Sequence, residues 1–118
     1  MTPNTLDASS AQPNLIVREA QLMALGRLWD HANGFSGQCR KTAAMLLSIY
    51  NGNRFQMDLT DFRGLDELLL EDCLQVLRLD YRAAAEIHKL LGVPGKAFEK
   101  LAAGWEIVEC VDFTDKSW

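Results

Sequence analysis

Apolar residues recur at helical spacing through most of this sequence. The pattern predicts helices over residues 15–32, 36–50, 65–81, 83–91 and 95–104. Asn-Gly dipeptides follow the first two segments, as expected where a helix ends in residues that tolerate a left-handed backbone. Segment 65–81 is apolar on all but one narrow stripe, so we expect it to be the central helix of a bundle.

The segments outside these helices divide the chain into three parts. Residues 1–14 are polar and rich in Ser, Thr, Pro and Asn, which predicts a disordered lead-in. Residues 15–106 form the helical domain, in which 54–57 read as a short extended segment or small hairpin. Residues 107–118 carry a few apolar side chains, so we expect a partly packed tail. The predicted fold class is all-α, a compact bundle of four to five helices.

Composition and charge then narrow the classes of partner. The chain has 118 residues, 48% of them hydrophobic, which suits a single domain with a real core. Residues 1–59 hold five Lys or Arg and four Asp or Glu, whereas residues 60–118 hold seven and twelve, for a net charge of −4. This balance argues against general binding to nucleic acid or anionic membranes. It favours a protein partner with a basic surface.

The cysteines and the N-terminal residues predict the compartment. Three widely spaced cysteines without a Cys-x-x-Cys motif are typical of reduced thiols in a cytoplasm. The first residues lack the basic start and apolar run of a signal peptide, and no apolar run has the length of a membrane span. We therefore expect a cytoplasmic protein.

Six carboxylates stand in the leucine-rich part of the chain, and helix capping and solvation explain most of them. They are Asp58, Asp61, Asp66, Glu67, Glu71 and Asp72. Asp72 differs, because its neighbours one helical turn away are apolar. A carboxylate there needs a partner, since burying an unpaired charge is costly. We expect a structural ion pair with Arg40, Arg54 or Arg63.

The sequence offers no constellation of catalytic or metal-binding residues. It holds two histidines, and Glu86-Ile87-His88 has the wrong spacing for a di-iron bundle. It has no phosphate-binding glycine loop, no nucleophile elbow, and no motif that places a Cys beside a His. We expect no enzymatic activity, no cofactor and no metal.

Two alternatives to hetero-protein binding follow from particular segments. Residues 84–101 are similar to a helix-turn-helix DNA reader, with Gly92 at the turn. His88 stands where a small residue is expected, and the second helix offers Lys96 and Lys100 but no Arg, Asn or Gln to read bases. Segment 65–81 provides the other alternative, a leucine-rich face covered in a twofold dimer.

Several motifs together resemble a family of small uncharacterised bacterial proteins carried on plasmids, integrative elements and phages. They are Ser36-Gly37-Gln38-x-Arg40, Asp58-Leu59-Thr60-Asp61 and Trp105 after the last helix. The resemblance covers roughly residues 20–106. It departs before Glu86, where a Pro is expected. The resemblance implies a setting in mobile genetic elements and no particular chemistry.

We therefore expect a small non-enzymatic accessory protein that acts by protein–protein binding, a counter-defence (anti-CRISPR-like) inhibitor being a sharper version. The candidate contact residues are Glu67, Glu71, Gln75 and Arg78 on the long helix, and Gln38, Arg40, Asn51, Asn53 and Arg54 in the loops. Turn chemistry is the alternative explanation for the loop group. Trp105 and Trp118 are candidate anchors, and Trp105 also suits the core.

Overall fold

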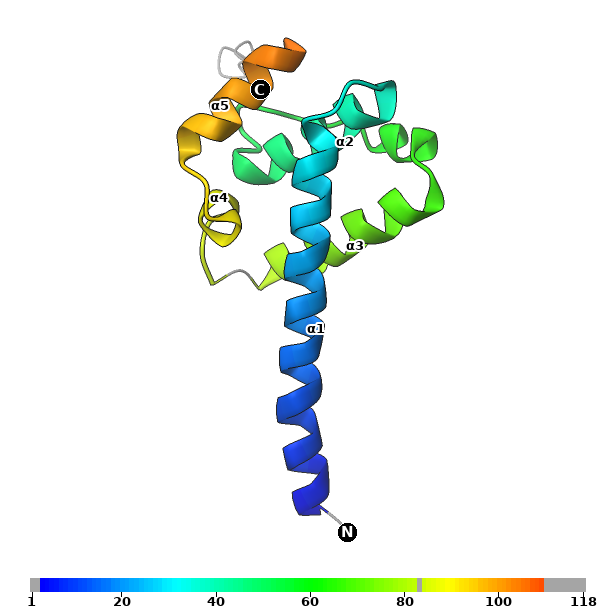
Figure 1. Ribbon diagram of the computed structural model, residues 1–118, viewed down its shortest axis with the longest axis vertical. Helices are drawn as coiled ribbons and strands as arrows, with labels where there is room; N and C mark the ends of the chain where they lie inside the picture. Colours follow the sequence, from blue (N-terminus) through cyan, green and yellow to red (C-terminus); the bar gives the residue numbers. More distant parts are fainter. Residues whose placement is uncertain (1–2, 83, 110–118) are drawn as a thin grey trace, which may run out of the picture.

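The computed structural model of the protein describes residues 3–82 and 84–109, with side chains from residue 17 onward (Figure 1). The fold is all-α, as the sequence predicts. The elements in chain order are α1 (Pro3–Ala32), α2 (Gly37–Tyr50), the 3-10 helix η1 (Leu59–Gly64), α3 (Glu67–Tyr81), α4 (Ile87–Leu91) and α5 (Gly95–Trp105). In these described residues no strand forms, and residues 51–58 link α2 to η1 as a turn followed by irregular chain.

The centre of the bundle is α2. Every side chain from Thr42 to Leu47 is buried, because α2 contacts α1, α5, η1, α3 and α4. The prediction that 65–81 would be central is wrong: α3 packs mainly on α1 and buries only Cys73, Val76 and Leu79. A periodic pattern gives the width of an apolar stripe, but it does not say which element covers the stripe.

The first helix is longer than predicted. It begins at Pro3 rather than after Asn14, so residues 3–14 are helical where a disordered lead-in was expected. Pro3 suits the first turn, where its missing N–H has no helical partner in any case. Once a helix has formed, each further residue adds a hydrogen bond at low entropic cost.

The long α1 also sets the shape of the molecule. Its N-terminal half extends alone, away from the other helices, and the molecule measures 58 × 35 × 28 Å (Figure 1). None of the described helices combines the length and the apolarity that crossing a membrane requires.

Short polar side chains start three of the helices. Ser36 Oγ accepts the Cys39 N–H at 3.3 Å, and an Asp58 carboxylate oxygen accepts the Thr60 N–H at 2.9 Å, as expected for capping residues. Asp66 does the same for α3, accepting the Leu69 N–H at 3.0 Å. Caps of this kind stabilise a helix start by about 1 kcal/mol each.

The last two connections differ from the pattern-based prediction. A helix was expected from residue 83, but α4 begins only at Ile87, whose side chain is buried. The alanines before Ile87 favour a helix by propensity, but they have no large side chain to bury. The helix therefore begins at Ile87, which packs in the core. After α5, Ile107 packs on the core, and the rest of the predicted tail from residue 110, Trp118 included, lies outside the described residues.

Candidate functional site: an aromatic cleft between α1 and α5

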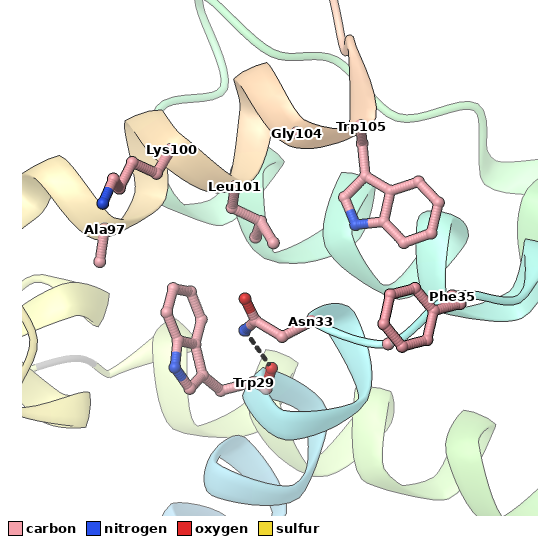
Figure 2. Close-up of a pocket in the computed structure, with 9 residues that line it drawn as sticks. Trp29, Asn33, Phe35, Ala97, Lys100, Leu101, Gly104 and Trp105 are labelled. Carbon is pink, nitrogen blue, oxygen red and sulfur yellow. Dashed lines mark hydrogen bonds between the residues drawn. The ribbon is translucent and has the colours of Figure 1, made fainter.

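A cleft of about 420 Å³ opens between the C-terminal end of α1, the α1–α2 turn and α5 (Figure 2). Its lining residues are Trp29, Asn33, Gly34, Phe35, Ala97, Lys100, Leu101, Gly104 and Trp105. The volume lies within the range of roughly 300–1,000 Å³ typical of ligand sites. Three of the lining residues are large aromatics, so the cleft suits an apolar group.

Aromatic stacking fixes the inner wall of the cleft. The Trp29 ring lies 4.8 Å, centroid to centroid, from the fully buried Phe98, and Phe98 stacks on Tyr50 at the same distance. This row runs from α1 through α5 to α2. Pairs with this geometry add about 0.5–1.5 kcal/mol each beyond the area that they bury.

Two hydrogen bonds fix the end of α1 at the cleft. Trp105 Nε1–H donates to the Ala32 carbonyl oxygen at 2.8 Å, and Asn33 Nδ2–H donates to the Trp29 carbonyl oxygen at 2.8 Å. Carbonyls in the last turn of a helix lack helical partners, so these side chains satisfy them. Trp105 therefore joins α5 to α1 while its ring still lines the cleft, which makes the cleft a preformed site.

Phe35 stands at one end of the cleft beside Trp105, opposite Trp29 and Lys100 (Figure 2). Its side chain is 97% exposed. Leaving a phenylalanine in water forgoes about 1.5–3 kcal/mol of burial free energy. An exposed ring at the rim of an aromatic cleft is typical of an interaction surface.

Among the residues that line the cleft, the charged one is Lys100. Lys96 and Lys100 are exposed one helical turn apart on α5, and no ion pair joins either to another described residue. Glu99 lies between them, but its carboxylate is bound by Arg54 and Tyr50. The cations on the outer face of α5 are therefore Lys96 and Lys100, whereas the Arg54 cluster holds two carboxylates for one guanidinium.

Arg54 is the centre of an ion-pair cluster rather than a free contact residue. Its guanidinium donates two hydrogen bonds to Glu99, both of 2.8 Å, and two to Glu109, of 2.9 and 3.0 Å. The two bonds to Glu99, together with one from the Tyr50 hydroxyl, lower the pKa of Glu99 to about 2. Arg54 likewise lowers the pKa of Glu109. The cluster joins the α2–η1 loop to α5 and the segment after it.

Asp72 pairs with Arg27 of α1, a donor that the sequence analysis did not name. The contact is bidentate, with Nε···Oδ2 at 2.9 Å and Nη2···Oδ1 at 2.8 Å. The Asp72 side chain is 16% exposed and that of Arg27 57%, so the pair lies at the edge of the α1–α3 interface. The expected donors Arg40, Arg54 and Arg63 do not take this role.

Two of the residues proposed as loop contacts, Gln38 and Asn51, hydrogen-bond to the backbone of the chain itself, and Gln38 and Arg40 lie in the first turn of α2. Gln38 Oε1 accepts the Asp66 N–H at 2.9 Å, which adds a hydrogen bond at the start of α3. Asn51 ends α2, and its Oδ1 accepts the N–H groups of Asn53 and Arg54, both at 3.2 Å. Arg40 and Asn53 have exposed side chains.

The contact residues proposed on the long helix α3 are mostly exposed, as a binding role requires. Glu67, Glu71 and Arg78 are exposed on α3 and Gln75 is half-buried. The nine proposed contacts thus fall into two groups, one along α3 and one at the start of α2 and in the loop that follows it, and neither group lines the aromatic cleft.

A hydrogen-bonded cluster of Cys39, His31 and Thr42 lies behind the cleft. No sequence motif indicated that a Cys and a His would lie side by side. The Cys39 Sγ is 3.6 Å from His31 Nε2, and His31 Nδ1 is 3.1 Å from Thr42 Oγ1. Thr42 donates its hydroxyl hydrogen to the Gln38 carbonyl, so it accepts from His31 Nδ1–H, and Nε2 is left to accept from the thiol.

A thiol hydrogen-bonded to a neighbouring base could react as a nucleophile, but the Cys39 thiol is not accessible from the cleft. Cys39 is only 6% exposed, and Gly34 covers its sulfur so closely that an added Cβ would lie 2.7 Å from Sγ. The cluster therefore holds the ends of α1 and α2 together. Among the described residues, no three His, Cys, Asp or Glu side chains group as metal ligands would.

Comparison with known proteins places the chain in a family. A family model described as a family of unknown function (DUF7673) matches residues 22–106. The chain belongs to this family. No curated protein and no solved structure matches the chain. The DUF7673 match begins where α1 starts to bury side chains and ends just after Trp105, so it includes the whole cleft.

The sequence analysis missed Phe35 and Trp29 as site residues, and it named Lys100 only in the helix-turn-helix alternative. The available signal was Phe35, a large apolar residue in a turn that is otherwise made of Asn, Gly and Ser. Trp29 and Lys100 gave no such signal, because each fits the pattern of its own helix. Only the packing of α5 against the end of α1 brings them together.

Proposed function

We propose that the protein is a non-enzymatic binding module whose aromatic cleft receives an apolar side chain of a partner protein. The observation that carries the proposal is Phe35, a ring 97% exposed at the rim of a preformed cleft. Aromatic residues dominate the energetics of protein interfaces, because they bury a large area with little loss of side-chain freedom. A partner that covers Phe35 would regain the burial free energy that the isolated chain forgoes.

The charges favour an acidic segment in the partner. Lys100 lines the cleft, Lys96 lies one helical turn away on α5, and the carboxylate of Glu99 is bound by Arg54. Complementary charges speed association and exclude partners with the wrong sign. The partner surface opposite the cleft would therefore carry carboxylates. The basic-surfaced partner expected from the acidic second half of the sequence stays a separate prediction.

The proposal extends to the biological setting. The resemblance to proteins of plasmids, integrative elements and phages supports an accessory role in mobile genetic elements, in which the cleft docks on a larger host or element-encoded protein. An anti-CRISPR-like inhibitor is one such role. Cys39 and Cys73 are free thiols, which suits the reducing cytoplasm where these processes occur.

Affinity capture with matched variants tests this function. Tagged wild-type protein, Phe35→Ser, Lys100→Glu and the control Leu68→Ser are incubated with nuclease-treated bacterial lysate at moderate salt, and bound proteins are identified by mass spectrometry. Leu68 is the control because it is 81% exposed but lies on α3. We expect one stoichiometric protein with wild type and Leu68→Ser, little with Phe35→Ser, and less with Lys100→Glu.

Two outcomes would contradict the proposal. Equal capture by Phe35→Ser would show that the cleft is not the binding surface. Recovery of nucleic acid but no protein in a parallel capture without nuclease would favour the helix-turn-helix alternative formed by α4 and α5. Salt-dependent DNA affinity at low ionic strength would then be the decisive measurement.

A further inference from the structure

A second apolar surface lies on α3, away from the cleft. Leu74 and Leu77 are each 40% exposed and Tyr81 is 80% exposed, while Leu70 is half-buried. These four residues, which we call the seam, follow one another in steps of four, three and four. That alternation is the heptad spacing of residues that pack between two paired helices.

The seam is not the face that packs inside the bundle. The core face of α3 carries Cys73, Val76 and Leu79, which are buried against other helices and chiefly α1. The seam runs along the outer flank instead. It borders an apolar hollow of about 130 Å³ that Leu77 lines together with Leu59 of η1, which is itself 74% exposed.

Charges along one edge of the seam are ordered by sign. Glu67 and Glu71 lie towards the start of α3, whereas Arg78 lies near its end and Arg82 directly follows it. In a parallel pair of α3 helices, the two charged edges would lie on opposite sides of the contact, so Glu71 and Arg78 of the two copies would not meet. In an antiparallel pair, Glu71 of one copy lies opposite Arg78 of the other, and the helix macrodipoles are also opposed.

We propose that two copies of this chain pair through antiparallel α3 helices about a twofold axis. In the register that the seam sets, Leu74 packs against Leu77 of the second copy and Leu70 against Tyr81. Two equivalent Glu71–Arg78 ion pairs then border the contact, because a twofold interface repeats every contact. This inference goes beyond the proposed function, since the cleft lies on α1 and α5.

The surroundings of the seam fit a self-contact of this kind. Leu59 adds to the apolar surface on the side of the seam away from the charged edge. A stable dimer buries roughly 800 Å² per partner, and this residue brings the apolar contact closer to that area. Ion pairs at the border add partner choice and orientation more than affinity. The apolar contact should therefore set the strength of the dimer, and the charges its direction.

Sedimentation of the full chain across a range of concentrations tests the apolar contact. We expect the mass to rise from one protomer towards two as concentration increases. Leu74→Gln should weaken the dimer about tenfold or more, which corresponds to the loss of one packed leucine at each of two symmetric positions. Leu68→Gln is the matched control, a leucine on the same helix beyond the charged edge, and should leave the dissociation constant unchanged.

Charge reversal tests the direction of pairing. Glu71→Arg alone and Arg78→Glu alone should each weaken the dimer, because each places like charges together twice. An equimolar mixture of the two variants should restore it, since every pair in the mixed dimer is again of opposite sign. Restoration also shows that both variants are folded.

Three results would overturn the proposal. They are a monomer at every concentration, a dimer that Leu74→Gln leaves intact, and a mixture of charge variants that fails to associate. The cleft proposal fails separately, because Leu74→Gln should still capture the cleft partner from lysate.

Discussion

At the scale of single residues, two glycines show how much the space around one carbon atom matters. A Cβ added at Gly34 would lie 2.7 Å from Cys39 Sγ and 3.2 Å from the His31 carbonyl oxygen, whereas a Cβ at Gly26 would have no neighbour within 4 Å. Gly34 is therefore required by close packing behind the cleft. Gly26 lies inside α1, where glycine only weakens the helix.

We expect the two alanine substitutions to act in opposite directions. Gly34→Ala should lower the free energy of unfolding by about 1–3 kcal/mol through overpacking against Cys39. Gly26→Ala should raise it by about 1 kcal/mol through helix propensity. Urea unfolding followed by circular dichroism measures both, and a stabilising Gly34→Ala would contradict the close contact.

The partner of Asp72 is also a matter of single residues. Asp72→Asn should lower stability by about 1 kcal/mol, since a bidentate pair is lost but Arg27 remains largely in solvent. A double-mutant cycle with Arg27→Gln should give a coupling energy of similar size. Arg40→Gln and Arg63→Gln, the donors expected from the sequence, serve as controls. Their effects should simply add to that of Asp72→Asn.

At the scale of elements, the Arg54 cluster joins segments that local interactions leave apart. Arg54 follows α2, Glu99 belongs to α5 and Glu109 comes after it. Because the folded-state pKa of Glu99 is lowered to about 2 from an ordinary value of 4.5, the unfolded chain binds protons before the folded protein does. The cluster therefore stabilises the fold fully above about pH 5, and its contribution falls as pH drops towards 2.

Replacing Arg54 should remove this pH dependence. Arg54→Gln is expected to lower the free energy of unfolding only modestly at neutral pH, because the groups are partly exposed and screened by solvent. Between about pH 5 and pH 2, the variant should lose less further stability than wild type. Unfolding free energies measured across this range give the comparison, and parallel curves for the two proteins would rule out the cluster as the source.

Helix positions could be predicted from the sequence where local chemistry decides them. Asp58 and Asp66 cap helices as expected, because a cap bonds an N–H only two or three residues away. α3 shows the limit of this method. Its narrow polar stripe predicted a central position, yet Leu74, Leu77 and Tyr81 are exposed, since no described element covers that flank.

At the scale of the whole molecule, the candidate site depends on contacts between distant parts of the chain. The cleft joins residues 29–35 to residues 97–105, and Arg27 reaches Asp72 across the α1–α3 interface. Hydrophobic periodicity, helix caps and turn residues do not indicate which distant parts of the chain come into contact. The sequence could therefore predict an all-α protein without a catalytic motif, but not where its surfaces lie.

The two proposed surfaces lie on different parts of the molecule and would serve different contacts. The cleft lies at the end of α1 near α5, whereas the seam follows the outer flank of α3. A dimer formed through α3 would leave both clefts open, so one assembly would present two equivalent sites. Binding of a repeated or dimeric partner would then gain from the second contact.

The composition of the cleft gives it a built-in spectroscopic signal. Two of the three tryptophans in the chain, Trp29 and Trp105, line it, and α3 has none. Any group that enters the cleft changes the polarity around both indoles and displaces water from them. The intrinsic emission of the unlabelled protein should consequently shift when the cleft is filled, while pairing through α3 should leave the spectrum of these two indoles unaltered.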